Sequence, residues 1–148
     1  LLDQLEEEEH NWKLARKYAV IEQRETRCEL YQTEDADVVI VAYGTSARVA
    51  KGAIKRLRSM GMKVGLFRPI TLWPFPMNEL RKLSEKTKYF LDFEMSLGQM
   101  IDDVRLALQG FADVGFFGRP GGVVPTPVEL ANIIEQRYFK NNGLTTRG

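Results

Sequence analysis

Three charged residues, Arg68, Glu94 and Arg119, stand at the ends of short apolar runs in this sequence. An arginine offers a planar guanidinium that binds carboxylates and anionic ligands, and a glutamate can pair with it. Two interpretations remain open for this set. Either Glu94 forms a structural ion pair with Arg68 or Arg119 and holds the loops together, or the arginines bind a partner's carboxylates or an anionic ligand.

The turn Tyr43-Gly44-Thr45-Ser46 has the composition of a phosphate-binding loop, because free backbone N–H groups at the start of a helix attract anions. No Lys-Ser or Lys-Thr pair follows at the spacing of a P-loop, and Ser46 stands where a dinucleotide fingerprint has its second glycine. We therefore favour a tight turn in which Thr45 or Ser46 caps the following helix.

The rarer residue types exclude several classes of site. Cys28 is the only cysteine, which leaves no intrachain disulfide and no ligand set for an iron–sulfur cluster or a structural zinc. His10 is the only histidine and lies in a charged stretch, so a solvated side chain is favoured over a catalytic triad. The first apolar run ends in Tyr43, where a phosphoreceiver domain needs paired carboxylates.

Composition and charge are those of an ordinary globular domain, with 44% hydrophobic and 28% charged residues among 148. A formal net charge of +1 gives no reason to expect nucleic acid or an anionic membrane as a partner. The N-terminal part carries a run from Glu6 to Glu9 and no secretory signal, and we expect a cytoplasmic protein. Because the chain opens on Leu1 rather than Met, we expect a piece of a longer chain.

The elements that must position these residues alternate regularly along the chain. Short apolar runs, each followed by a polar or glycine-rich break and a helical stretch, are expected to be strands: Val38 to Tyr43, Val64 to Phe67, Tyr89 to Phe93 and Val114 to Phe117. This rhythm predicts an α/β fold with three layers, a mainly parallel sheet and helices on both faces. The breaks then meet at the carboxyl ends of the strands, where open α/β sheets usually bind ligands and partners.

The predicted helices frame this sheet. Residues 4 to about 30 contain no glycine or proline and predict one long N-terminal helix, with two neighbouring apolar stripes that suggest a helix clamped between surfaces. Further helices are expected over 77–83 and 98–109, and Thr126-Pro127-Val128-Glu129 predicts the capped start of the last one. We divide the chain into a connector helix and loop (1–34), an α/β domain (35–140) and a polar tail (141–148).

Trp73-Pro74-Phe75-Pro76 adds a rigid aromatic surface near the arginines, of the kind found at protein interfaces. No nucleophile, general base, cofactor-binding set or metal-ligand set can be assembled from these residues, so we expect no catalytic, cofactor or metal site in this chain. We expect a docking rim instead, and assign to it Gly44, Thr45, Ser46, Arg68, Trp73, Glu94, Arg119, Gly121 and Gly122.

Four sequence segments resemble those of a known family, and they occur in the family's order and at its spacing. They are Val38-Val39-Ile40-Val41-Ala42-Tyr43-Gly44-Thr45, Arg68-Pro69-Ile70-Thr71-Leu72-Trp73-Pro74-Phe75-Pro76, Glu94-Met95-Ser96-Leu97-Gly98-Gln99-Met100 and Gly118-Arg119-Pro120-Gly121-Gly122. They are similar to the C-terminal part of the alpha subunit of 2-oxoacid:ferredoxin oxidoreductases, which is itself similar to the C-terminal domain of transketolases. The resemblance covers about Asp35 to Phe139, and the preceding helix resembles the family's interdomain connector.

The resemblance implies an oxidative decarboxylation, in which thiamine diphosphate attacks a 2-oxo acid, coenzyme A takes the acyl group, and electrons pass through iron–sulfur clusters to ferredoxin. Thiamine diphosphate, Mg²⁺ and the clusters are implied for the whole complex and not for this chain. The implied partners are the upstream catalytic domain of the same subunit, the beta and other subunits, ferredoxin and coenzyme A, without nucleic acid or membrane. This chain alone is expected to be inactive. The sequence from Arg68 to Pro76 resembles that of enzymes acting on 2-oxoglutarate or a branched-chain 2-oxo acid more than that of enzymes acting on pyruvate.

Two alternative functions remain. The first is the equivalent domain of a transketolase or of a 2-oxoacid dehydrogenase E1 component, and the Gly118 to Gly122 loop argues against it. The second is a freestanding flavodoxin-like or receiver-like binding module, and the missing acidic pair and phosphate loop argue against that.

Overall fold

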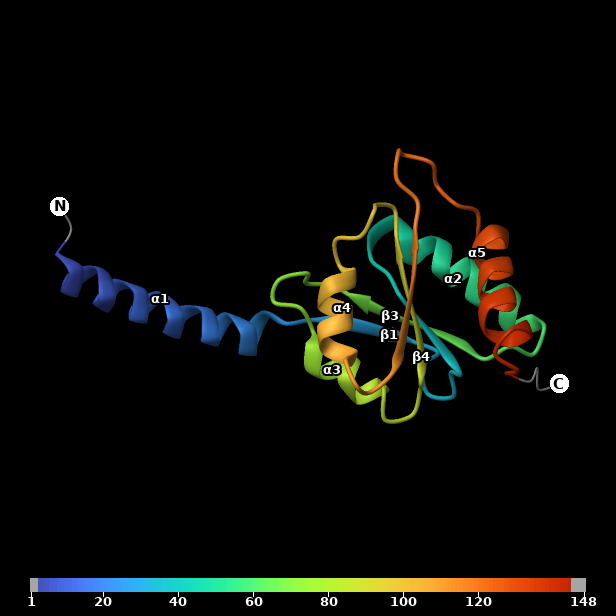
Figure 1. Ribbon diagram of the computed structural model, residues 1–148, viewed down its shortest axis with the longest axis horizontal. Coiled ribbons are helices and arrows are strands. Elements are labelled where there is room, and N and C mark those ends of the chain that lie inside the picture. The colour runs from blue at the N-terminus through green and yellow to red at the C-terminus, as the bar shows by residue number, and fades with distance from the viewer. Residues whose placement is uncertain (1–2, 145–148) are drawn as a thin grey trace.

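The computed structural model describes residues 3–144 as a five-stranded sheet between helices, with a long helix ahead of it (Figure 1). Its elements are α1 (Gln4–Glu25), β1 (Cys28–Tyr31), β2 (Val38–Val41), α2 (Gly44–Ser59), β3 (Val64–Pro69), α3 (Met77–Leu83), β4 (Tyr89–Glu94), α4 (Ile101–Leu108), β5 (Asp113–Gly118), α5 (Pro127–Ile134) and the π-helix η1 (Glu135–Lys140). Residues 1–2 of the predicted connector and 145–148 of the predicted tail lie outside the described residues.

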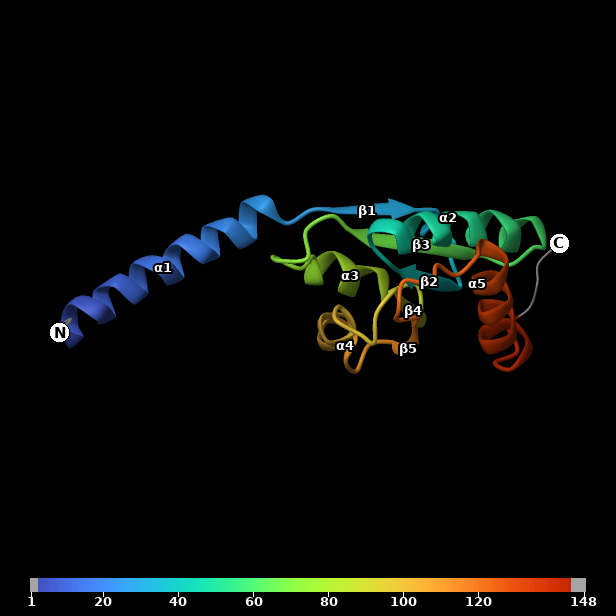
Figure 2. The same ribbon diagram turned by 90° about the horizontal axis from the view of Figure 1, so that it is seen from above.

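The strand order is β1-β3-β2-β4-β5, and every strand pair is parallel except β1 with β3. All four residues of β2 are buried, because this Val-Val-Ile-Val strand lies in the middle of the sheet and is covered on both faces. Helices α2 and α5 lie on one face and α3 and α4 on the other (Figures 1 and 2). The predicted three-layer α/β fold is confirmed.

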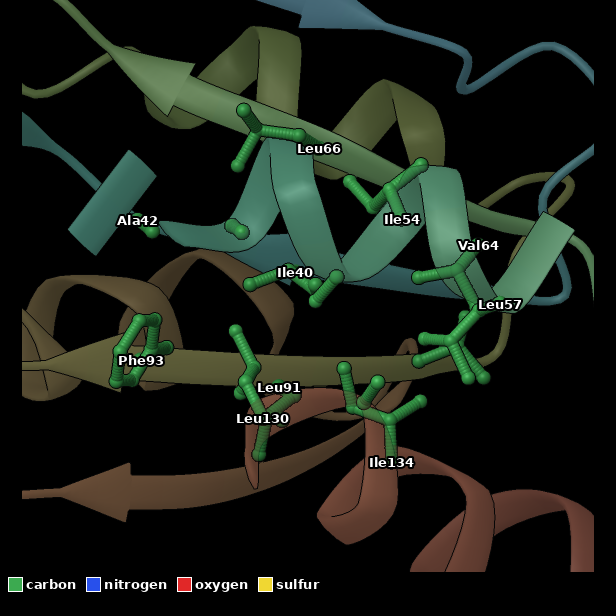
Figure 3. Close-up of a cluster of buried hydrophobic side chains, with 14 of the residues drawn as sticks. Ile40, Ala42, Ile54, Leu57, Val64, Leu66, Leu91, Phe93, Leu130 and Ile134 are labelled. Carbon is green, nitrogen blue, oxygen red and sulfur yellow. The ribbon is translucent and has the colours of Figure 1, made fainter. Parts of the chain in front are cut away.

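Alternate residues of the strands fill two separate apolar clusters. Val38 and Ile40 point to the side of α2 and α5, whereas Val39 and Val41 point to the side of α3 and α4. In the first cluster, side chains of α2 and α5 meet those of the strands, as Figure 3 shows for Ile54, Leu57, Leu130, Ile134, Leu66, Leu91 and Phe93. The same alternation decides to which face each side chain at a strand end points.

The first strand was not predicted. Helix α1 ends at Glu25, although the helix was expected to continue to about residue 30. Residues 28–31 instead form the edge strand β1, which pairs antiparallel with β3. A Cβ atom added at Gly65 would lie 2.6 Å from the Gln32 carbonyl oxygen, so this glycine lets the chain after β1 cross close to β3. The helix predicted over residues 26–30 is therefore wrong, whereas the polar loop predicted after Tyr31 is found over residues 32–37.

Several helix boundaries also differ from those predicted. Helix α4 begins at Ile101 and not at Gly98, and α2 begins at Gly44 after Tyr43, with no side chain capping it, so the predicted Thr45 or Ser46 cap is wrong. The capping box at the start of α5 is confirmed: Thr126 Oγ1 accepts from the N–H of Glu129 at 3.1 Å, and Glu129 Oε2 accepts from the N–H of Thr126 at 2.7 Å. No helix within residues 3–144 combines the length and apolarity needed to cross a membrane.

Helix α1 extends away from the rest of the molecule (Figures 1 and 2). None of its 22 residues is buried. It carries large apolar side chains in solvent nonetheless: Leu5 is 73% exposed and Trp12 60% exposed. Its contact with the domain is near its end, where the Tyr18 ring meets the Trp73 ring edge to face with 5.7 Å between centroids.

Candidate functional site

The three charged residues that end strands do not meet. Arg68 lies on the face of the sheet that α2 covers, Arg119 reaches α5, and Glu94 lies on the opposite face under the start of α4. Glu94 is two residues after Asp92 and four after Phe90, which belongs to the cluster under α3 and α4, so strand alternation places it on that side. Of the two interpretations left open, the ion pair between Glu94 and either arginine is therefore wrong.

Arg68 forms an ion pair with Glu29 on the neighbouring strand β1, with Nη1 2.7 Å from Oε2. The same carboxylate also accepts a hydrogen bond from Lys51 of α2. Hydrogen bonds from Lys51 and Arg68 lower the pKa of Glu29. Lys51 and Arg68 also border a cavity of about 430 Å³ at the N-terminus of α2, whose other lining residues are Gly44, Thr45, Ala47 and Arg48.

Arg119 pairs with Glu129 of α5, with Nη1 3.2 Å from Oε1, and both side chains are partly exposed. Because Glu129 also closes the capping box, the pair ties the loop after β5 to the start of α5. Gly121 and Gly122 follow in that loop with φ of 86° and 78°, which favour glycine, and both are exposed. Arg119 thus serves a contact within the fold.

The Glu94 carboxylate caps the start of α4 from the neighbouring strand β4, because no residue at the start of the helix does so itself. Glu94 is 1% exposed, and its carboxylate accepts hydrogen bonds from the backbone N–H groups of Gln99, Met100 and Ile101 at 2.9–3.2 Å. No side chain at Met100, the N-cap position, caps the helix. Burial by itself would raise the pKa of Glu94, but the adjacent Asp92 carboxyl and these N–H groups lower it.

Asp92, two residues earlier in β4, is fully buried, and sequence reasoning did not single it out as a site residue. Neither of its carboxyl oxygens has a hydrogen-bond partner of ordinary geometry among the residues that the structure describes. Burial, together with the neighbouring Glu94 carboxylate, raises the pKa of Asp92 to about 9. Burial and the same two acids raise the pKa of Tyr43. At neutral pH, Asp92 is therefore protonated.

A wide cleft lies at the same edge of the sheet, between the end of α1 and the starts of α3 and α4. We call it the acidic cleft. It measures about 760 Å³ and is lined by Glu22, Gln23, Thr26, Leu72, Trp73, Pro74, Phe75, Met77, Asn78, Glu79 and Asp103. Trp73 was predicted to belong to a docking surface and is 59% exposed here. The three acids were not predicted, although Glu79 and Asp103 each follow closely on a strand-end loop in the sequence.

The structure separates the nine residues of the predicted docking rim. Ser46 and Glu94 are buried and cannot belong to an exposed rim. Arg68 and Arg119 are half-exposed and paired within the chain. The remaining five are exposed and lie at three places: Gly44 and Thr45 at the start of α2, Trp73 at the acidic cleft, and Gly121 and Gly122 in the loop after β5.

Comparisons with known proteins identify the family of this chain. A sequence model of the pyruvate:ferredoxin oxidoreductase core domain II family matches residues 36–130, which is more than half of the chain. This chain belongs to that family. It corresponds to domain II, the transketolase C-terminal-like domain, of a 2-oxoacid:ferredoxin oxidoreductase alpha subunit, as the sequence predicted.

Relatives within this family are similar over most of the chain. Ketoisovalerate oxidoreductase subunit VorB of Methanothermobacter marburgensis is 47% identical over 135 residues, which are 91% of this chain and 37% of the relative. 2-oxoglutarate synthase subunit KorA of the same organism is 37% identical over 102 residues, 69% of this chain and 27% of the relative. The chain thus spans 37% and 27% of the length of these two curated relatives.

Solved structures show the same fold. A 2-oxoglutarate:ferredoxin oxidoreductase from Magnetococcus marinus, with 2-oxoglutarate, coenzyme A and succinyl-CoA bound, superposes with a TM-score of 0.73 at 21% identity, covering 92% of this chain and 24% of that chain. A split-gene transketolase in an inactive tetramer gives a TM-score of 0.59 at 19% identity, covering 74% and 40%. The family match favours the oxidoreductase over the transketolase and flavodoxin-like alternatives.

Proposed function

We propose that this chain is a non-catalytic docking domain, C-terminal in the alpha subunit of a thiamine diphosphate-dependent 2-oxoacid:ferredoxin oxidoreductase. In this proposal the oxidative decarboxylation takes place in the upstream domain of the subunit and in the beta subunit. The domain positions these parts through surfaces that it leaves uncovered. Family membership supports the assignment to this enzyme class, and the exposed apolar side chains of α1 support the docking role.

The state of α1 is the observation that carries the proposal. A helix in water is stabilised mainly by packing its apolar face, and α1 buries none of its residues while exposing Leu5, Trp12, Tyr18 and Val20. Exposed aromatic and aliphatic side chains along one element are typical of a protein interface. A connector between this domain and other parts of the subunit accounts for a long helix of this composition.

The substrate proposed for the whole enzyme is a branched-chain 2-oxo acid or 2-oxoglutarate in preference to pyruvate. Two similar relatives are named a ketoisovalerate oxidoreductase subunit and a 2-oxoglutarate synthase subunit, and ketoisovalerate is a branched-chain 2-oxo acid. Pyruvate synthase subunit PorA of Pyrococcus furiosus is also similar, at 38% identity over the shorter span of 88 residues. The substrate pocket itself belongs, in this proposal, to other parts of the complex.

We assign the cofactors of the complex to its other parts. Within residues 3–144, no three His, Cys, Asp or Glu side chains gather closely enough to hold a metal ion. An iron–sulfur cluster takes about four cysteine ligands, and Cys28 is the single cysteine of this chain. Thiamine diphosphate, its Mg²⁺ and the clusters are thus proposed for the upstream domain and the partner subunits, with coenzyme A and ferredoxin as reactants of the whole enzyme. A cytoplasmic complex, without nucleic acid or membrane, completes the proposal.

Co-purification tests this proposal. The full-length alpha subunit is expressed with the other subunits, either unchanged or with Leu5→Ser and Trp12→Ser in α1. We expect the unchanged subunit to assemble, and the variant to lose at least about tenfold in assembly affinity because the apolar contacts are removed. A matched Glu6→Gln and Lys13→Gln variant on the same helix is expected to assemble normally. If the unchanged subunit stays free of partners, the docking role is wrong.

A second measurement tests where the cofactor binds. The assembled complex and this chain alone are titrated with thiamine diphosphate and Mg²⁺ in a calorimeter. We expect heat of binding from the complex and none from the chain alone. Tight binding to the chain alone would contradict the assignment of the active site to other domains.

A further inference from the structure

The acidic cleft is built from three separate parts of the chain. Glu22 comes from the last turns of α1, Glu79 from the first turn of α3, and Asp103 from the first turn of α4. Trp73 stands on the loop between β3 and α3. Because β1 runs against the other strands, the end of α1 reaches the same edge of the sheet as the starts of α3 and α4.

The charges of the cleft are all of one sign. No lysine or arginine is among its lining residues, and none of its three carboxylates forms an ion pair within residues 3–144. Other acids of the domain are neutralised by basic partners: Glu29 by Lys51 and Arg68, and Asp35 by Arg58 and Lys63. The acidic cleft therefore offers uncompensated negative charge to whatever binds there.

The aromatic wall of the cleft is held in place. The ring of Tyr18 packs edge to face on Trp73, at an interplanar angle of 86°. Thr71 Oγ1 accepts from the backbone N–H of Arg27 at 3.0 Å and donates to the Pro74 carbonyl at 2.8 Å, which fastens the loop to the segment after α1. An exposed indole in a fixed position is a good surface for a cation, since the face of the ring attracts positive charge.

The spacing of the acids favours an organic cation over a metal ion. Among the described residues no three carboxylates converge as metal ligands, whereas a cleft of about 760 Å³ has room for a whole side chain. Exposed apolar side chains lie near the cleft: Leu72 and Ile70 on the loop that carries Trp73, and Trp12 further along α1. Exposed apolar and aromatic side chains beside a binding site are typical of a protein interface, so a side chain of a protein partner suits the cleft better than a small free ion.

We propose that the acidic cleft receives an arginine side chain of a partner polypeptide, with the guanidinium over Trp73 and hydrogen-bonded to Glu79 or Asp103. This inference rests on the proposed docking function and adds the chemistry of the partner. An arginine suits the cleft better than a lysine, because its planar group can lie on the indole face and bind a carboxylate through two N–H groups at once.

Binding of a defined peptide to this chain tests the proposal. The probe is a short blocked peptide that alternates alanine and arginine, and the control replaces each arginine by citrulline, its uncharged analogue. In a Trp12→Phe background, Trp73 is the single tryptophan that reports fluorescence, because the chain has two. We expect the arginine peptide to bind at least about tenfold more tightly than the citrulline peptide, and to weaken with added salt. Equal binding of both peptides, or none, overturns the proposal.

Variants then locate the site. The pair Glu79→Gln and Asp103→Asn is expected to weaken the arginine peptide by at least about tenfold. The matched pair Glu25→Gln and Asp102→Asn removes two acids outside the lining and should leave binding unchanged. Circular dichroism verifies folding of each variant. Trp73→Ala removes the fluorescent reporter, so its binding is measured by calorimetry, and it should weaken binding independently of charge. If both acid pairs behave alike, the cleft is not the binding site.

The two proposals fail in different ways. A complex that assembles normally, while this chain shows no preference for the arginine peptide, defeats the cleft inference and leaves the docking role intact. A chain that binds the peptide at the cleft, from a subunit that never assembles with partners, defeats the docking role instead.

Discussion

Two acidic regions lie at the same edge of this sheet and use their carboxylates in opposite ways. Glu94 is buried, and backbone N–H groups at the start of α4 satisfy its charge. The acids of the cleft, Glu79 and Asp103, stand in the first turns of α3 and α4 without an ion-pair partner in the described part of the chain. A carboxylate whose hydrogen bonds are all made inside the fold supports stability, whereas an unpaired one beside an exposed indole is free to recognise a partner.

The largest effect is expected from removal of Glu94, which tests whether this buried carboxylate supports the stability of the fold. Glu94→Ala leaves the buried N–H groups of Met100 and Ile101, and the partly buried N–H of Gln99, without an acceptor. This should lower the free energy of unfolding by about 4 kcal/mol. Urea unfolding followed by circular dichroism measures the change. Glu34→Ala, at an exposed acid, is the control and should stay within about 0.5 kcal/mol of the parent. A small effect at Glu94 would mean that the α4 start does not depend on it.

The pH dependence of stability tests the partner of Glu94. The folded-state pKa of Asp92, at about 9, lies above that of an unfolded chain, about 3.9, so between these values unfolding releases a proton. Stability therefore falls as pH rises, by up to about 1.4 kcal/mol per unit and nearly 3 kcal/mol between about pH 6 and about pH 8. Asp92→Asn removes this titration and should flatten the curve. Parallel curves for both proteins would show that Asp92 titrates normally.

Neutralisation of the cleft should have a much smaller effect on the fold. The pair Glu79→Gln and Asp103→Asn removes two charges that favour helix starts, each worth about 0.3–1 kcal/mol. We expect the free energy of unfolding to fall by about 1 kcal/mol, while peptide binding weakens by at least about tenfold. A loss as large as that of Glu94→Ala would place these acids among the structural ones and break the contrast.

The smallest effect is expected at Arg119. Its pair with Glu129 is partly exposed, and exposed ion pairs contribute about 0.5 kcal/mol. Arg119→Ala should therefore change the urea midpoint only slightly and leave assembly of the full complex unaffected. Loss of assembly in this variant would support the prediction that the strand-end arginines dock on partners.

The sequence predicted the layers of the fold well and the site less well, for physical reasons. The apolar run at β2 and the capping box at Thr126 depend on local patterns, and both are found. Strand β1 carries no such pattern, because Cys28–Tyr31 is held by pairing with a strand nearly forty residues away. The predicted pairing of Arg68 with Glu94 assumed that strand ends converge, whereas side-chain alternation sends them to opposite faces.

The acidic cleft shows what a linear reading misses. Its three acids come from helices that are far apart in sequence, and they meet because one antiparallel edge strand brings the end of α1 back to the sheet. Trp73 was recognisable beforehand, since aromatic residues are frequent at protein interfaces and this one stands beside a proline in a loop. The three acids around it could be brought together only from the topology of the sheet.

Amide hydrogen exchange, measured on this chain alone and on the assembled oxidoreductase, tests most directly whether the domain docks through α1 and the acidic cleft. The account predicts slower exchange in the complex over Gln4–Glu25 and residues 70–79, with little change over 94–101, where Glu94 already satisfies the backbone. Unchanged exchange over α1 and the cleft, or new protection confined to Arg68 and Arg119, would contradict it.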